Sequence, residues 1–143
     1  MDLNEKLAQR RLELEKEKKI AQTDEFRYSQ NDLSRELISL LLQGHQDAAR
    51  ALFNVAKDPT GDYLNYKIKD YAGNTILIAA AQAGDTKIFD YVLPKSMNYL
   101  NTENNQNETP LLSAIGRGHT DIALKLLRAG AKPLIFDGGE LVD

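Results

Sequence analysis

The stretch NNQNETPLLSAIGRGHTDIALKLL at residues 104–127 repeats, without gaps, the pattern of DYAGNTILIAAAQAGDTKIFDYVL at residues 70–93. Polar, glycine and apolar positions coincide at a constant offset of 34 residues, as in Thr75 with Thr109, Leu77 with Leu111, Gly84 with Gly118, Ile88 with Ile122 and Leu93 with Leu127. A fixed period of this length is the signature of a repeat protein, in which each unit is one small supersecondary structure. The sequence therefore predicts a stack of similar units.

A poorer copy of the same pattern precedes these two. In ELISLLLQGHQDAARALF, residues 36–53, the matching apolar and glycine positions fall 40 residues before their counterparts in the next copy. The extra residues lie in KDPTGDYLNYKIK, residues 57–69, where Pro59 and Gly61 indicate a loop. We therefore expect about three repeats and the start of a further one, over residues 31–69, 70–103 and 104–136, with a partial hairpin over 137–143.

The chemistry of one unit predicts a pair of short antiparallel helices. Thr109 followed by Pro110 indicates a helix start, because the threonine hydroxyl can accept from a free N–H and proline has no N–H to leave unpaired. Gly84 and Gly118 stand where the first helix of each pair must end with a positive φ, which costs little only for glycine. One such pair cannot bury its apolar face alone, whereas stacked pairs can.

This pattern resembles the ankyrin repeat. Residues 104–131 carry the family's T-P-L, G-H, L-L and G-A elements, at Thr109-Pro110-Leu111, Gly118-His119, Leu126-Leu127 and Gly130-Ala131. Residues 70–93 carry a partial set of the same elements. The resemblance implies an all-α fold, a solenoid of stacked helix–turn–helix pairs with short hairpin loops, preceded here by a charged N-terminal helix.

Two departures from the family pattern bear on the fold. The histidine that usually follows T-P-L is Ile78 in one copy and Leu112 in the other, so the hydrogen bonds of that imidazole are expected to be absent. Asn104 and Asn107 replace the Asp and Gly of the hairpin turn. Because asparagine tolerates positive φ better than most residues, we expect the turn to survive.

The N-terminal part of the chain has a different composition. Residues 1–30 contain seven basic and seven acidic side chains and neither Gly nor Pro, which predicts one solvated helix over residues 3–21. A coiled-coil partner is the alternative, through a thin apolar stripe of Leu3, Leu7, Leu14 and Ala21 that Arg10 and Glu17 interrupt. The expected division is a charged helix and linker over 1–30 and an ankyrin-like repeat domain over 31–143.

The C-terminal end of the stack is expected to expose an apolar helix face, because the sequence stops where a fourth copy would begin its hairpin. Three explanations compete. A partner or a second copy covers the face, the chain is truncated, or the last residues fold back over it, through Leu134, Ile135, Phe136 and Leu141. We favour fold-back or truncation over dimerisation, and so expect a monomer rather than a homodimer.

The resemblance implies binding to another protein, through the hairpin tips and the exposed side of the first helix of each pair. Carried over position by position, it selects Tyr71, Ala72, Asn74, Gln82, Ala83, Asn105, Gln106, Glu108, Gly116 and Arg117. The poorly matched first copy offers only Leu42 and Gln43. Tyr71 and Arg117 are the first choices because tyrosine and arginine are enriched among interface hot spots. The alternative is that each is ordinary surface.

Other classes of chemistry find little support. The chain has no cysteine and two histidines, and His45 and His119 follow a glycine at positions where the family uses histidine structurally. We therefore expect no catalytic residues, no metal and no cofactor. The formal net charge of −3 and the lack of a long apolar run argue against nucleic-acid and membrane partners. The nearest approach to a single-strand nucleic-acid site is an aromatic–basic strip, comprising Lys57, Tyr63, Tyr66, Lys67, Lys69 and Tyr71.

The sequence thus favours a non-catalytic cytoplasmic adaptor or inhibitor that works by occupying another protein's surface. One version is a scaffold that joins two proteins, with the N-terminal helix as the second contact. Another is a bacterial effector delivered into a host cell, which would use the same binding mode. The opposing hypothesis is a nucleic-acid-binding or enzymatic protein.

Overall fold

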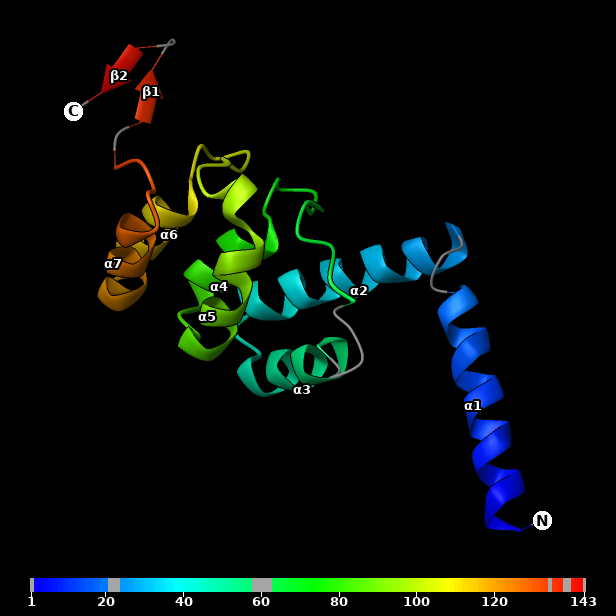
Figure 1. Ribbon diagram of the computed structural model, residues 1–143. Coiled ribbons are helices and arrows are strands. Elements are labelled where there is room, and N and C mark those ends of the chain that lie inside the picture. Colours follow the sequence, from blue (N-terminus) through cyan, green and yellow to red (C-terminus); the bar gives the residue numbers. More distant parts are fainter. Residues whose placement is uncertain (1, 21–23, 58–62, 134, 138–139, 143) are drawn as a thin grey trace.

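Three pairs of antiparallel helices stack in a row (Figure 1). The computed structural model describes residues 2–20, 24–57, 63–133, 135–137 and 140–142. The pairs are α2 (Asp24–Leu42) with α3 (Gln46–Ala56), α4 (Ile76–Ala83) with α5 (Thr86–Lys95), and α6 (Pro110–Gly116) with α7 (Thr120–Arg128). A single 3₁₀ turn, η1 (Met97–Tyr99), follows α5. The predicted all-α solenoid of stacked helix pairs is confirmed.

The inner helices form one continuous layer. Helix α2 packs against α4 and α4 against α6, while each also packs against the outer helix of its own pair. Helix α4 lies in the middle of the stack, and all six residues from Ile76 to Ala81 are fully buried. The three consecutive alanines of α4, Ala79 to Ala81, leave room for both neighbouring helices to approach closely. The core therefore runs through the stack rather than lying inside one pair.

The helix starts and turns follow the expected chemistry. Thr75 Oγ1 accepts from Ile78 N–H at 3.2 Å, and Thr109 Oγ1 makes the equivalent bond to the N–H three residues ahead at 3.2 Å. Gly84 and Gly118 have φ of 74° and 75°, in the left-handed region, which ends the inner helix of each pair. The predicted threonine caps and the predicted left-handed glycines are both confirmed.

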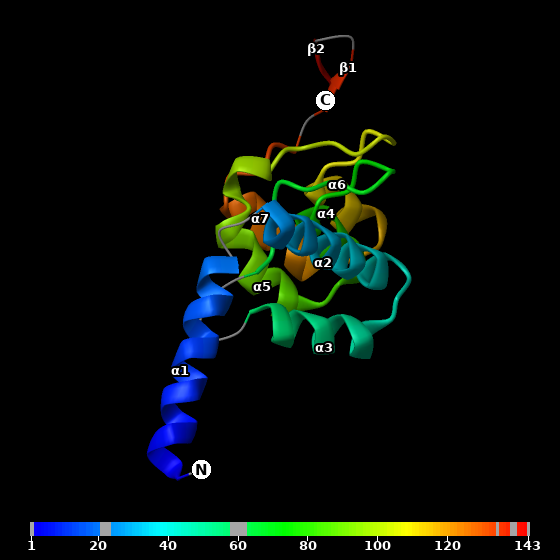
Figure 2. The same ribbon diagram turned by 90° about the vertical axis from the view of Figure 1, so that its right-hand side faces the viewer.

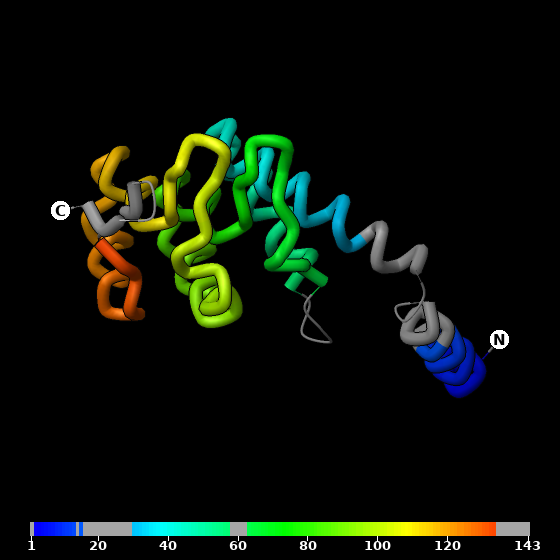
Figure 3. Tube along the Cα trace, turned by 90° about the horizontal axis from the view of Figure 1, so that it is seen from above, coloured from blue at the N-terminus to red at the C-terminus, as the bar shows by residue number. Residues whose placement is uncertain are grey.

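The hairpin turns of the last two copies are alike despite different sequences. Asp70 Oδ1 accepts from the N–H groups two and four residues ahead, at 3.0 and 2.7 Å, and Asn104 Oδ1 does the same at 2.9 and 3.0 Å. The turn then needs a left-handed residue, which is Gly73 at φ 80° in one copy and Asn107 at φ 61° in the other. The expected asparagine turn is confirmed, and Figure 3 shows the two hairpins side by side.

The N-terminal helix α1 (Leu3–Ile20) stands away from the stack (Figures 1 and 2). Its described side chains, those of residues 3–13 and 15, are all exposed, as expected of a solvated helix. The boundary expected near residue 30 falls within α2, which is the longest inner helix. The division into two domains at that point and the coiled-coil alternative both stay predictions.

Within the described residues, the C-terminal end of the stack exposes an apolar side chain, as predicted. Ile115 on α6 is 58% exposed, whereas Ala81, its counterpart 34 residues earlier, is fully buried by the next pair. The chain continues into a two-stranded antiparallel hairpin of β1 (Ile135–Asp137) and β2 (Glu140–Val142), in which Phe136 pairs with Leu141. The side chains of residues 134–143 lie outside the described part, and with them the fold-back hypothesis.

Candidate partner-binding surface

The hairpin tips present the most exposed of the predicted site residues. The side chain of Tyr71 is fully exposed, and Ala72 and Gln106 are also exposed. Asn105 joins the two tips, because its backbone N–H donates to Ala72 O at 2.8 Å and its side-chain Nδ2 donates to Tyr71 O at 3.0 Å. One backbone–backbone and one side-chain–backbone hydrogen bond therefore hold the tips together, and the exposed side chain of Tyr71 lies beside them.

Gly73, next to the contact between the two tips, has a second reason to be glycine besides its positive φ. A Cβ placed on Gly73 would lie 2.8 Å from Asn105 Oδ1 and 3.0 Å from Asn105 N. The first distance is shorter than real Cβ contacts and the second is tight, so a larger residue would displace the Asn105 side chain and crowd its backbone N–H. The close approach of the two tips depends on this position.

Asn74 lies differently from the other predicted residues, because it is 5% exposed. Its Nδ2 donates to Asp70 Oδ2 at 3.2 Å, and its Oδ1 accepts from Asn104 Nδ2 at 2.9 Å. Neighbours within the chain thus occupy both ends of its amide, although its position in the repeat suggested an accessible side chain. Asn74 therefore aligns the two hairpins with each other.

On the inner helices, one carboxylate brings several predicted residues together. Glu108 Oε2 accepts from Gln82 Nε2 at 3.3 Å and from Ser113 Oγ at 3.2 Å, and Arg117 NH1 lies 3.8 Å away. Glu108 is 32% exposed and Arg117 is 42% exposed, so the network reaches the surface. Ala83 is exposed beside it. The 3.8 Å separation makes the Arg117 contact a loose ion pair, which leaves the donors of the guanidinium available.

The remaining predicted positions are less distinctive. Gly116 is exposed at the end of α6. In the first copy Leu42 is half-buried against the core, and Gln43 is exposed with its Nε2 donating to Ser39 Oγ at 2.9 Å. These residues do not take part in the networks at the tips or around Glu108.

Sequence reasoning missed an ion pair that joins the first two repeats. Arg50 Nε on α3 donates to Asp85 Oδ2 at 2.8 Å, and the side chain of Asp85 is 1% exposed. Burial raises the pKa of this carboxyl, but the hydrogen bond from Arg50, the N–H of Ile88 and the positive charge of Arg50 outweigh it, so the pKa of Asp85 lies below its ordinary value. Asp85 also caps α5 by accepting from the N–H groups of Lys87 and Ile88. No signal within either repeat indicated this pairing.

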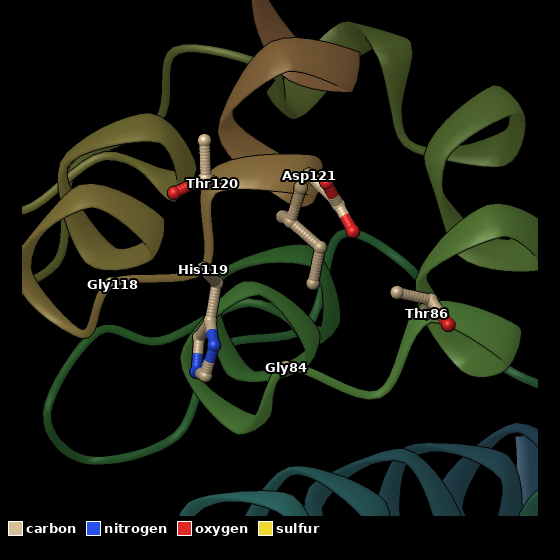
Figure 4. A pocket seen from close by; sticks show the side chains of 7 residues that line it. Gly84, Thr86, Gly118, His119, Thr120 and Asp121 are labelled. Carbon is tan, nitrogen blue, oxygen red and sulfur yellow. The ribbon is translucent and has the colours of Figure 1, made fainter.

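The two histidines differ because only one has a preceding repeat to contact. His119 Nε2 donates to Gln82 O at 3.0 Å, and its ring lies over Gly84 (Figure 4). Thr86 and Asp121 line the shallow hollow beside it. His45, in the first repeat, is exposed and its side chain caps nothing. In the described part of the chain, no three His, Cys, Asp or Glu residues are grouped so as to hold a metal ion.

None of the helices that the structure describes is both long and apolar enough to cross a membrane. The family model described as ankyrin repeats, in three copies, matches residues 28–137. No curated protein matches the chain.

Among solved structures, the chain is similar to a chain in the complex of the predatory endopeptidase Bd0816 from Bdellovibrio bacteriovorus with the immunity protein Bd3460. The identity is 30% and the TM-score 0.53, over 67% of this chain and 46% of that chain. This chain therefore spans a little less than half the length of the chain that it matches.

Proposed function

The chain belongs to the ankyrin-repeat family, and from this premise we propose that it is a non-catalytic adaptor or inhibitor that binds a partner protein through its hairpin tips and the concave face of its inner helices. Ankyrin repeats serve protein–protein interaction. The proposal assigns partner contacts first to Tyr71 and Arg117, and then to the exposed residues around them.

One observation carries the proposal: contacts within the chain already order part of this surface in the absence of a partner. Asn105 hydrogen-bonds to the backbone of the tip that carries Tyr71, Glu108 accepts from Gln82, and Arg117 NH1 lies 3.8 Å from the Glu108 carboxylate. Groups already ordered in the free protein lose less conformational entropy on binding, so more of the contact energy appears as affinity. The polar character of the network suits a contact in which water bridges some of the hydrogen bonds.

The similarity to a solved structure bears on the finer role. The similar solved chain comes from a complex of an endopeptidase with an immunity protein, which favours an inhibitor over an adaptor. In either role the protein acts in the cytoplasm, and a bacterial effector delivered into a host cell would use the same surface. A nucleic-acid-binding or enzymatic role has no comparable support in the described residues.

The test compares two pairs of substitutions in the full chain. Tyr71→Ala with Arg117→Ala should reduce capture of partner proteins identified by mass spectrometry, while Val55→Ala with Arg128→Ala, exposed residues outside the proposed surface, should not. The thermal midpoints of both variants should match that of the wild type. Undiminished capture by the Tyr71/Arg117 variant would place the binding surface elsewhere.

A further inference from the structure

A second hollow lies outside the proposed binding surface and shares none of its residues. Its volume is about 560 Å³, and its walls come from the N-terminal half of α2, the loop at residues 64–68 and the segment from Lys95 to Tyr99. The α2 wall exists because α2 has 19 residues, whereas α4 has 8 and so offers no equivalent extension. The hollow is therefore particular to the first repeat.

Hydrogen bonds of Asn65 join the loop at residues 64–68 to α2. Asn65 N–H donates to Ser34 Oγ at 2.8 Å, and Asn65 Nδ2 donates to Asn31 Oδ1 at 2.8 Å. Asn65 Oδ1 in turn accepts from Lys67 N–H at 3.3 Å. Both side-chain ends of Asn65 thus tie the loop in place, so this wall is ordered without a ligand.

Several polar groups of the hollow have no partner of their own. Among the residues that the structure describes, the side chains of Gln30, Asn98 and Tyr99 make no hydrogen bond, and the ammonium of Lys67 makes no ion pair. Amide side chains can both donate and accept, which matches the alternating groups of an extended peptide backbone. The half-buried rings of Tyr66 and Tyr99 add apolar surface on which a peptide can rest.

The charge of the hollow contrasts with that of the chain. Its charged lining residues, within the described part, are Lys67 and Lys95, although the chain carries a formal net charge of −3. Tyr66 and Lys67 belong to the aromatic–basic strip seen in the sequence, but the structure divides that strip, since Tyr71 lies at the hairpin tip. Two lysines suit a single carboxylate better than the repeating phosphates of a nucleic acid.

We propose that this hollow binds an extended segment of a partner protein that carries an acidic side chain, with the carboxylate at Lys67 and the peptide backbone along Gln30 and Asn98. This hollow shares no residue with the candidate partner-binding surface at the hairpin tips and the concave face of the inner helices. A protein with both sites can hold two partners at once, and the acidic-segment site remains even if the concave surface binds nothing.

The test uses the ¹⁵N-labelled full chain and two degenerate nonapeptide libraries, one with Glu and one with Gln fixed at the central position. The Glu library should shift the amide signals of residues 65–68 and of Asn98 and Tyr99 in a saturable manner. Its apparent affinity should exceed that of the Gln library by about threefold, the size of a partly exposed ion pair. Equal affinity for the two libraries, or shifts confined to the hairpin tips, would overturn the proposal.

Charge reversal supplies the matched control. Lys67→Glu should abolish the preference for the Glu library, whereas Lys87→Glu, an exposed lysine outside the hollow, should retain it. Both substitutions are on exposed side chains, and unchanged thermal midpoints would show that both variants fold. Retention of the preference by Lys67→Glu, or tighter binding of oligothymidine than of the Glu library, would reject an acidic peptide as the ligand.

Discussion

The imidazole of His119 occupies the space that a side chain at Gly84 would need: a Cβ on Gly84 would lie 2.5 Å from His119 Cε1. The contact joins the turn of one repeat to the turn of the next, and the hydrogen bond from His119 Nε2 to Gln82 O fixes the ring there. Gly84 therefore meets two requirements, a left-handed φ and the absence of a side chain. Gly118 has a nearly identical φ but open space around it.

This difference makes the two glycines a matched pair for mutation. Gly118→Ala should lower the free energy of unfolding by about 1 kcal/mol, the cost of a left-handed alanine. Gly84→Ala should lower it by about 2–4 kcal/mol, because displacement of the His119 ring adds to the same backbone cost. Urea denaturation of both variants measures the gap. Equal losses would mean that the His119 ring moves aside without penalty.

The Gly84 example shows how far the sequence could predict this fold and its surface. The offset of 34 residues located the left-handed turns and the threonine caps, because those depend on residues close together in the chain. It could not reveal how closely the His119 ring approaches Gly84, because that distance depends on how neighbouring pairs pack. Gly118 stands in the last helix pair that the structure describes and has no such neighbour.

The candidate partner-binding surface likewise contains features that the sequence could predict and features that only the packed structure reveals. Tyr71 and Asn105 were predicted from their place in the repeat, and the structure confirms their exposure. Asn74 occupies an equally suggestive place but is buried, because its amide is used between the hairpins. The partnership of Arg50 with Asp85 joins residues 35 positions apart on different pairs, so only the packed structure reveals it.

That ion pair makes stability depend on pH. Because the pKa of Asp85 is lowered on folding, its contribution is present above the ordinary pKa of about 3.9 and is lost as the pH falls through the lowered value. Arg50→Met should therefore destabilise the protein at pH 7, since the buried carboxylate of Asp85 loses its charged partner and keeps only the N–H groups of Lys87 and Ile88. Its stability should also fall less steeply below pH 4 than that of the wild type.

The matched control for this pair is Lys125→Met. Lys125 Nζ lies 2.7 Å from Asp90 Oδ1, but the carboxylate of Asp90 is mostly exposed. This variant should lose less than about 1 kcal/mol. Chemical denaturation at pH 7 and pH 3 compares the two, and equal losses at pH 7 would show that burial of Asp85 contributes nothing to the strength of its pair.

Neighbouring leucines on α7 test the packing of the stack. Leu126 is fully buried between the helix pairs, whereas Leu127 is 42% exposed at the open end. Leu126→Ala should lower the free energy of unfolding by about 2–5 kcal/mol, and Leu127→Ala by clearly less, because a cavity forms only where atoms surround the deleted group. Thermal unfolding followed by circular dichroism compares the stability losses of the two variants. A larger loss at Leu127 would show that something covers the open face in solution.

The left-handed asparagine of the second hairpin offers a stabilising change. Asn107 has φ 61°, while the corresponding position in the preceding hairpin is Gly73. Asn107→Gly should be neutral or stabilising by a few tenths of a kcal/mol, about the strain released, and Asn107→Val should cost about 1–2 kcal/mol because a β-branched residue resists this conformation. Urea midpoints rank the variants. A more stable valine variant would mean that the turn adopts another conformation in solution.

Removal of residues 1–22 tests whether α1 supports the repeats. The described side chains of α1 are exposed, and α2 begins at Asp24, so the deletion takes away no core atoms among the side chains that the structure describes. We expect the thermal midpoint of the truncated chain to stay within about 2 °C of the full-length value, because surface segments without packing contribute little to stability. We also expect both chains to sediment as monomers, since Arg10 and Glu17 interrupt the apolar stripe that a coiled coil would need. A dimer of the full chain that dissociates on truncation would instead assign α1 to self-association and favour the coiled-coil alternative.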